Sequence, residues 1–200
     1  MSNSSKKYKI LMVLIIIVVV CGLIGAHFYT VEMRKKKIFS PFLNSEKLQN
    51  IKSAGGENEY SRNRDIFSGR EWYTFYDGDY IYSFHTMGYW EKASSGSRKF
   101  EGSILIIKTC ENRCRIRLHI TPSAKGWEYS LGLTDFAIVD EYDTVGIWGD
   151  AVDKRGKPLE ASYLTKDGRQ SWLALYEKFE VEIMAMFATI NEVFGEDAFR

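Results

Sequence analysis

An uninterrupted apolar segment near the N-terminus constrains this chain more than any other feature. Ile10–Ala26 reads ILMVLIIIVVVCGLIGA and contains no charged residue. As a helix it would be about 26 Å long, at the short end of what crosses a bilayer, and Phe28 and Tyr29 can extend it through the interface. We therefore expect a transmembrane anchor at residues 10–29, in contact with membrane lipid, after a short cytoplasmic tail at residues 1–9.

Two other interpretations require the apolar segment to be cleaved from the mature protein. A signal peptide has an apolar core of roughly 7–15 residues followed by small residues. Ile24-Gly25-Ala26 is a passable cleavage site, but the apolar run before it is longer than that core. A lipoprotein would use Cys21, yet Val20 stands where a small residue is expected. The sequence favours the uncleaved anchor.

Charge around the segment leaves its orientation nearly balanced. Lys6, Lys7 and Lys9 precede it, and the run RKKK at 34–37 follows it. Positive charges close to the short N-terminal side favour an N-terminus inside the cell. The cysteines discussed below favour the orientation with the N-terminus inside the cell.

The remainder of the chain is mildly acidic. Residues 38–200 contain 20 Lys and Arg against 25 Asp and Glu, a net charge of −5, because seven basic residues lie in 1–37. A nucleic-acid-binding domain carries a basic patch or stripe. The sequence therefore predicts no nucleic-acid partner.

Residues 30–69 are expected to form a stalk or linker. From Ile38 the composition turns polar, Ser45 can cap one short helix, and Ala54-Gly55-Gly56 begins a Gly/Asn/Ser/Arg mixture. We place the globular domain, exported and β-rich, at residues 70–200.

Alternating aromatic residues open this domain. In EWYTFYDGDYIYSFH, Asp77-Gly78 lies between two strand-like runs, a strong hairpin signal. A two-residue turn there pairs Phe75 with Tyr80 and Tyr73 with Tyr82. One face of the hairpin should carry Tyr73, Phe75, Tyr80, Tyr82 and Phe84. Further strands are expected at 127–133, 136–139, 145–148 and 159–164.

The C-terminal segment changes from strand to helix spacing. Its large apolar residues recur every three or four positions, which favours one continuous amphipathic helix. Alternation over 179–183 is also compatible with a strand. The stripe consists of Trp172, Tyr176, Phe179, Ile183, Phe187, Ile190 and Phe194. We expect an α+β fold: an N-terminal transmembrane helix, then an antiparallel sheet or sandwich with a C-terminal helix packed on it.

Cys110 and Cys114 flank a three-residue loop between two apolar runs. Pairing them places Ile106 opposite Leu118 and Ile104 opposite Ile120, with clean alternation on the second strand. Paired strand residues lie within the distance that a disulfide spans. A zinc site needs four ligands, and a redox pair has Cys-x-x-Cys spacing. We predict a disulfide, which supports an exported domain because disulfides persist outside the reducing cytosol.

Catalytic patterns are not evident in the sequence. We predict no catalytic residue, no metal ligand and no cofactor site, since the Gly-x-Ser-x-Gly, phosphate-loop and His-Glu-x-x-His patterns are missing. Aromatic residues are crowded between 72 and 90, more than one sheet face can bury, and Tyr and Trp are favoured at interfaces. The candidate partner-binding surface consists of Trp72, Tyr76, Trp90, Arg117 and His119.

These expectations combine into a functional hypothesis. The chain is a single-pass protein of a bacterial inner membrane with its C-terminal domain in the periplasm. It is favoured to be non-enzymatic and to bind another envelope protein, as part of an envelope or secretion assembly. The alternative is an envelope saccharide-binding module or hydrolase that uses surface aromatics and paired carboxylates. A cytoplasm-facing domain with reduced cysteines also stays open.

Overall fold

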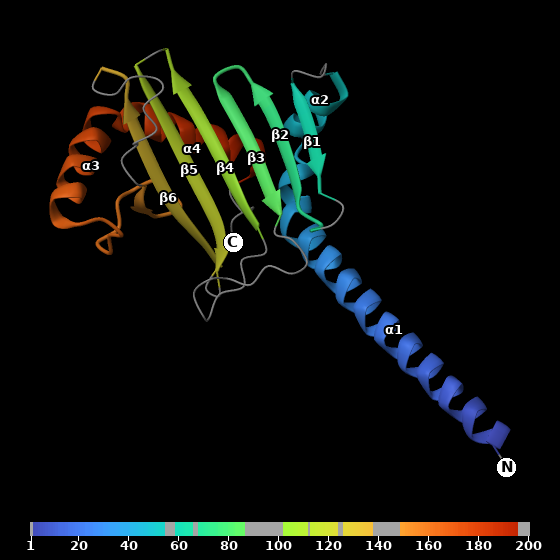
Figure 1. Cartoon of the computed structure of the whole chain (residues 1–200). Helices are drawn as coiled ribbons and strands as arrows, with labels where there is room; N and C mark the ends of the chain where they lie inside the picture. Colours follow the sequence, from blue (N-terminus) through green and yellow to red (C-terminus); the bar gives the residue numbers. More distant parts are fainter. Residues whose placement is uncertain are drawn as a thin grey trace. The chain divides into compact units, whose positions relative to one another are not determined.

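The computed structural model describes residues 2–54, 59–65, 68–86, 102–111, 113–123, 126–137 and 149–195. The chain divides into two units, Met1–Ile38 and Phe39–Arg200. Figure 1 shows a long helix followed by a sheet with further helices. The two units are described separately.

Helix α1, Ser2–Leu43, makes up the first unit and enters the second. Its segment Leu11–Leu43 contains an 18-residue window with a mean hydropathy of 2.8, so the segment is long and apolar enough to cross a membrane. Large apolar side chains from Leu11 to Val20 are exposed. A helix that is apolar on all sides needs an apolar environment. One helix of membrane-spanning character near the N-terminus is thus present.

The second unit contains one open antiparallel sheet. Its seven strands are ordered β1 to β7 as in the sequence, and each pairs with the next. The strands are β1 Tyr60–Arg64, β2 Glu71–Asp77, β3 Tyr80–Thr86, β4 Gly102–Cys110, β5 Cys114–Ser123, β6 Gly126–Asp135 and β7 Asp150–Val152. The described strands form one sheet, so they do not show the second layer of a sandwich.

The four later expected strands have different outcomes. The strand expected at 127–133 lies inside β6. Residues 159–164 are irregular instead of extended. Phe136 and Ala137 form a turn, and the rest of the strands expected at 136–139 and 145–148 lies outside the described residues.

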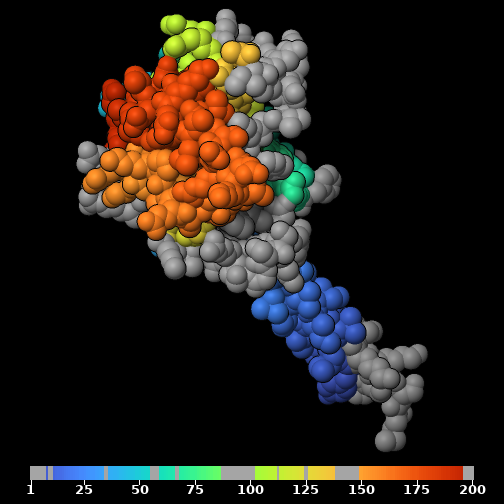
Figure 2. Space-filling view, turned by 90° about the vertical axis from the view of Figure 1, so that its left-hand side faces the viewer, coloured from blue at the N-terminus to red at the C-terminus, as the bar shows by residue number. Residues whose placement is uncertain are grey.

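One face of the sheet, which we call the core face, carries the large buried side chains. Helices α3, Lys166–Lys178, and α4, Glu180–Phe194, contribute the rest of that core, and Figure 2 shows them in orange to red on one side of the unit. The Trp172 indole Nε1 donates to the Leu131 carbonyl at 2.8 Å. The Tyr82 and Phe194 rings meet edge-on at 5.8 Å. The fold is therefore α+β.

The C-terminal stripe is divided between two helices instead of one. Phe179 takes φ −114° and ψ 20°, which ends α3 and begins α4. Trp172 and Ile183, on either side of this break, are both fully buried. The expected single helix is wrong. The spacing of the apolar residues did not reveal the break at Phe179, because α3 and α4 on either side of it face the same core.

The first hairpin has the expected faces but a shifted register. Phe75 pairs with Tyr82 and Tyr73 with Phe84, so the turn consists of Gly78 and Asp79. Gly78 adopts φ +57°, a left-handed conformation that glycine takes at little cost. The shift amounts to two residues, and side chains alternate with a period of two, so every side chain keeps its face.

The second hairpin follows the expected register throughout. Ile104 pairs with Ile120, Ile106 with Leu118, and Cys110 with Cys114. The Cα atoms of the two cysteines are 5.1 Å apart, and their sulfur atoms lie within disulfide distance. The hairpin geometry predicted for this cysteine pair is confirmed.

The segment expected to be a stalk contains folded structure. Helix α2 covers Glu46–Ala54, and β1 is the edge strand of the sheet. Three apolar side chains before β1 are 2% exposed or less: Phe39, Phe42 and Leu48. The folded unit therefore begins near Phe39 and not near residue 70. The polar composition of the segment as a whole concealed this, because its few apolar residues form no strand or helix pattern long enough to predict a packed element.

Candidate functional site

The residues singled out in the sequence lie on the second face of the sheet, opposite the core face. We define the second face by strand alternation and the observed pairing. Its central side chains are Trp72, Thr74, Tyr76, Ile81, Ser83, His85, Leu105, Ile107, Arg115, Arg117, His119, Ser130 and Gly132. Four of the five candidate surface residues are among them, and Trp90 lies outside the described residues. Figure 1 views the sheet with α4 behind it.

Tyr76 and Arg117 belong to one row across four strands. Tyr76 pairs with Ile81, Ile81 with Ile107, and Ile107 with Arg117. At a strand spacing of about 4.8 Å, their backbones are about 14 Å apart. His119 is the next residue on the same face of β5. The row therefore joins an aromatic residue, two aliphatic residues and a cation.

Exposure differs along this surface. The Tyr76 side chain is 44% exposed. His119 is also exposed, whereas Trp72 and Arg117 are half-buried. Tyrosine and tryptophan combine a large apolar area with a polar tip, which suits them to binding surfaces. The four residues thus offer apolar area together with polar groups that a partner can contact.

Two histidines on the second face have lowered pKa values. Burial lowers the pKa of His85. Desolvation by its surroundings also lowers the pKa of His119, although part of that ring is exposed, and the proximity of His85 lowers it further. Both imidazoles are neutral at pH 7, and each offers one donor and one acceptor.

A buried carboxylate holds the β1 edge of the sheet. Glu71 is 6% exposed, and it accepts from the Arg62 guanidinium at 3.0 Å and from the Tyr73 hydroxyl. Arg64 lies 3.3 Å from the same carboxylate. Burial alone would raise the pKa of Glu71, but the hydrogen bonds and arginine charges outweigh it and lower the pKa. Burial and the hydrogen bond to Glu71 raise the pKa of Tyr73 to about 12.

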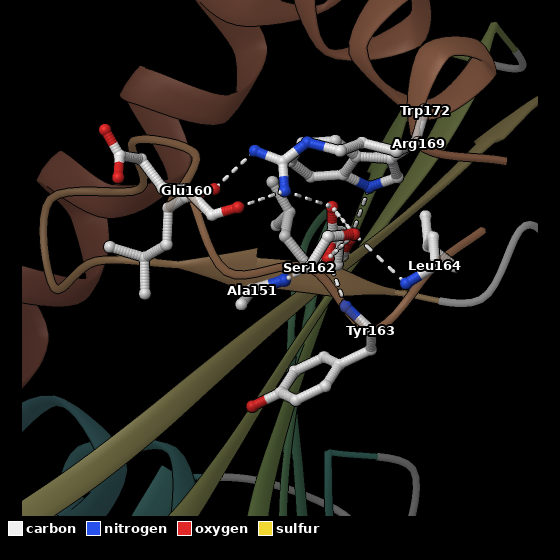
Figure 3. Close-up of polar contacts among 10 residues, drawn as sticks. Ala151, Glu160, Ser162, Tyr163, Leu164, Arg169 and Trp172 are labelled. Atoms are coloured by element: carbon white, nitrogen blue, oxygen red, sulfur yellow. Dashed lines mark hydrogen bonds and ion pairs between the residues drawn. The ribbon is translucent and has the colours of Figure 1, made fainter. Parts of the chain in front are cut away.

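A second buried carboxylate, that of Asp150, lies on the opposite edge strand β7, and Figure 3 shows Ser162, Tyr163 and Arg169, which contact it. Asp150 is 1% exposed and accepts from the Ser162 hydroxyl at 2.8 and 2.9 Å and from the Tyr163 amide at 3.0 Å. The Arg169 guanidinium lies 3.9 Å from Asp150 and donates to the Glu160 carbonyl at 2.8 Å. This cluster fastens segment 159–164 and α3 to β7.

Ion pairs also surround the tip of the cysteine hairpin. Asp135, 2% exposed, pairs with Lys178 at the end of α3. Arg113, in the hairpin loop, lies 2.9 Å from Glu182 on α4. The hairpin tip is thereby connected to both helices at their junction. Although burial opposes it, the hydrogen bond from Lys178 lowers the pKa of Asp135.

These three buried carboxylates have structural partners on the sheet or helices. The part of the chain that the structure describes contains no group of three or more His, Cys, Asp or Glu side chains that could hold a metal ion. Sequence reasoning did not find the Glu71 and Asp150 clusters. Apart from Tyr73, which lies on the same strand as Glu71, the side-chain partners come from other segments of the chain, so sequence spacing does not predict these clusters.

No family model, no curated protein and no solved structure matches this chain. The functional argument therefore depends on the residues of the chain itself. The second face brings together Trp72, Tyr76, Arg117 and His119, of which Tyr76 and His119 are exposed.

Proposed function

We propose that this chain is a single-pass protein of a bacterial inner membrane whose folded unit, outside the cytoplasm, binds another envelope protein through the second face. The role is non-enzymatic, within an envelope or secretion assembly. The observation that carries the proposal is the common placement of Trp72, Tyr76, Arg117 and His119 on one sheet face.

The location is supported by two features. The α1 segment has the length and hydropathy of a membrane span. Cys110 and Cys114 are directly paired with their sulfur atoms within disulfide distance, and disulfides persist in oxidising compartments. An N-terminus inside the cell is consistent with the lysines that precede the apolar run.

The binding role is supported by the composition of the second face. Tyrosine, tryptophan and arginine are the residue types most often dominant in protein interfaces. Tyr76 is 44% exposed, although it lies on a strand whose other face buries Glu71 and Phe75. Burial in a core does not explain the exposed Tyr76 ring, whereas a binding role does.

Photo-crosslinking in cells tests the proposal. Tyr76→p-benzoylphenylalanine in the full chain should yield a defined adduct with another protein on irradiation. The control position is Val181, which is 80% exposed on α4. An adduct at 76 and not at 181 supports the proposal. The same adducts at both positions, or none at 76, contradicts it, and an adduct with carbohydrate would favour a saccharide-binding module.

A further inference from the structure

Arg117 differs from the other arginines of the sheet and helices in its surroundings. Most of those have an identified partner: Arg62 and Arg64 pair with Glu71, Arg113 with Glu182, Arg169 with Asp150, and Arg115 stacks over Phe136 at 5.3 Å. Among the residues that the structure describes, no acidic side chain pairs with Arg117. Arg117 is nevertheless half-buried.

Among the described residues, the neighbours of Arg117 on the second face carry no negative charge. Its direct partners are Ile107 on β4 and Gly132 on β6. Along β5 the flanking side chains on this face are Arg115 and His119. Glu128 is the nearest acidic residue of β6 on this face, four positions from Gly132, or about 13 Å along the strand. A partly desolvated cation in this setting lacks the compensation that such charges normally have.

In the part of the sheet that the structure describes, two glycines, Gly132 and Gly149, lie beside Arg117. A Cβ atom at Gly132 would lie 3.7 Å from the Arg117 Cβ and 4.0 Å from the Gly149 Cα. Two glycines are therefore adjacent here, and neither places a side chain over the sheet next to the arginine. An incoming chain can approach the backbone closely at such a position.

Arginine has the geometry for one class of group in particular. Its planar guanidinium presents paired donors that match a carboxylate in a bidentate arrangement. Beyond Ile107 and Ile81, the row ends at the exposed ring of Tyr76. The surface therefore suits a segment with an acidic residue and an apolar or aromatic residue about 14 Å apart, since the row spans three strand spacings of about 4.8 Å.

We infer that the second face binds an acidic segment of a partner protein, with a partner Asp or Glu on the Arg117 guanidinium above Gly132 and apolar partner side chains toward Tyr76. This inference depends on the proposed function and specifies the chemistry of its partner. The folded region carries net negative charge overall, 20 basic against 25 acidic residues in 38–200. An acidic partner is therefore directed to this position by local charge complementarity and repelled elsewhere.

The test uses Arg117→Lys in the full chain in membranes. Lysine keeps the charge, and its amine, unlike a guanidinium, is joined to a nearby carboxylate by a water-soluble carbodiimide. Treatment should produce a protein adduct whose mapped linkage joins residue 117 to an Asp or Glu of another protein. The matched control is Arg155→Lys, an exposed arginine in the turn after β7, which should give no such adduct.

Charge reversal provides a second measurement. Arg117→Glu should reduce the photo-adduct formed from position 76 at least tenfold, whereas Arg155→Glu should leave it unchanged. A photo-adduct at 76 that survives Arg117→Glu, without any carbodiimide linkage at 117, overturns the acidic-segment inference and leaves the proposed function standing. Binding of phosphatidylglycerol vesicles that depends on Arg117, without a protein adduct, also overturns it. The absence of any photo-adduct removes the proposed function itself.

Discussion

Glu71 remains charged although its side chain is nearly inaccessible to water. Burial disfavours a carboxylate, but the Tyr73 hydroxyl and two arginines provide compensating hydrogen bonds and charge. Both arginines belong to β1, so the carboxylate fastens the edge strand to β2. This matters because β1 has only five residues, and three of them, Arg62 to Arg64, are exposed.

Glu71→Gln should lower the free energy of unfolding by about 1–3 kcal/mol at pH 7, because the charged hydrogen bonds are lost inside the fold. The lowered pKa of Glu71 makes its contribution fully present above its unfolded value of about 4.3 and progressively lost below it. The stability difference between wild type and variant should therefore shrink between pH 5 and pH 3. Urea unfolding followed by tryptophan fluorescence measures both effects.

Glu177→Gln is the control for this measurement. Glu177 is exposed on α3, and a surface substitution of this kind changes stability by less than about 0.5 kcal/mol. A Glu71 variant no less stable than the Glu177 variant at pH 7 would contradict the role of the cluster.

At the scale of elements, the two hairpins show what sequence patterns can specify. The register of the cysteine hairpin could be predicted because its second strand alternates cleanly and Cys110 and Cys114 fix the loop. In the aromatic hairpin, shifting the register by two residues keeps Tyr73, Phe75 and Tyr82 on the same face. The hydrophobic pattern therefore predicted the faces but not the register. For the same reason, Tyr76 could be assigned to the second face from sequence alone.

The cysteine hairpin should be oxidised in cells. Alkylation of intact cells before lysis should leave Cys110 and Cys114 unmodified, and their peptide should be two hydrogens lighter without reductant, in a chain carrying Cys21→Ser. Replacing both cysteines by serine should cost about 2 kcal/mol, because a five-residue ring removes little entropy from the unfolded chain. Two alkylated thiols, with a C-terminal phosphatase fusion inactive, would contradict the extracytoplasmic location.

At the scale of the whole molecule, the boundary of the folded unit could not be read from composition. Phe39 and Phe42 contact the Phe84 ring at centroid distances of 6.5 Å, and Leu48 is fully buried. These residues are separated from the sheet by polar sequence that resembles a linker. Burial of individual side chains from a hydrophilic segment depends on tertiary packing, which no local pattern encodes.

A fragment of residues 39–200 should fold, whereas a fragment of residues 70–200 should not. The shorter fragment lacks three core side chains, each contributing about 1.5–3 kcal/mol by burial, and it lacks β1. Their combined loss is comparable to the total stability of many domains. Limited proteolysis and thermal unfolding by circular dichroism compare the two. Equal protease resistance and equal cooperativity would show that the N-terminal residues are dispensable.

The sheet order β1 to β7 also bears on how such a chain acquires its structure when it is delivered N-terminus first. Each strand pairs with the strand that precedes it in the sequence. Pairing can therefore proceed one hairpin at a time, before the later sequence has been delivered. The helices that cover the core face are the last to arrive. Until the helices arrive, the assembled sheet exposes its apolar core face to water. A chaperone would be most useful during that interval.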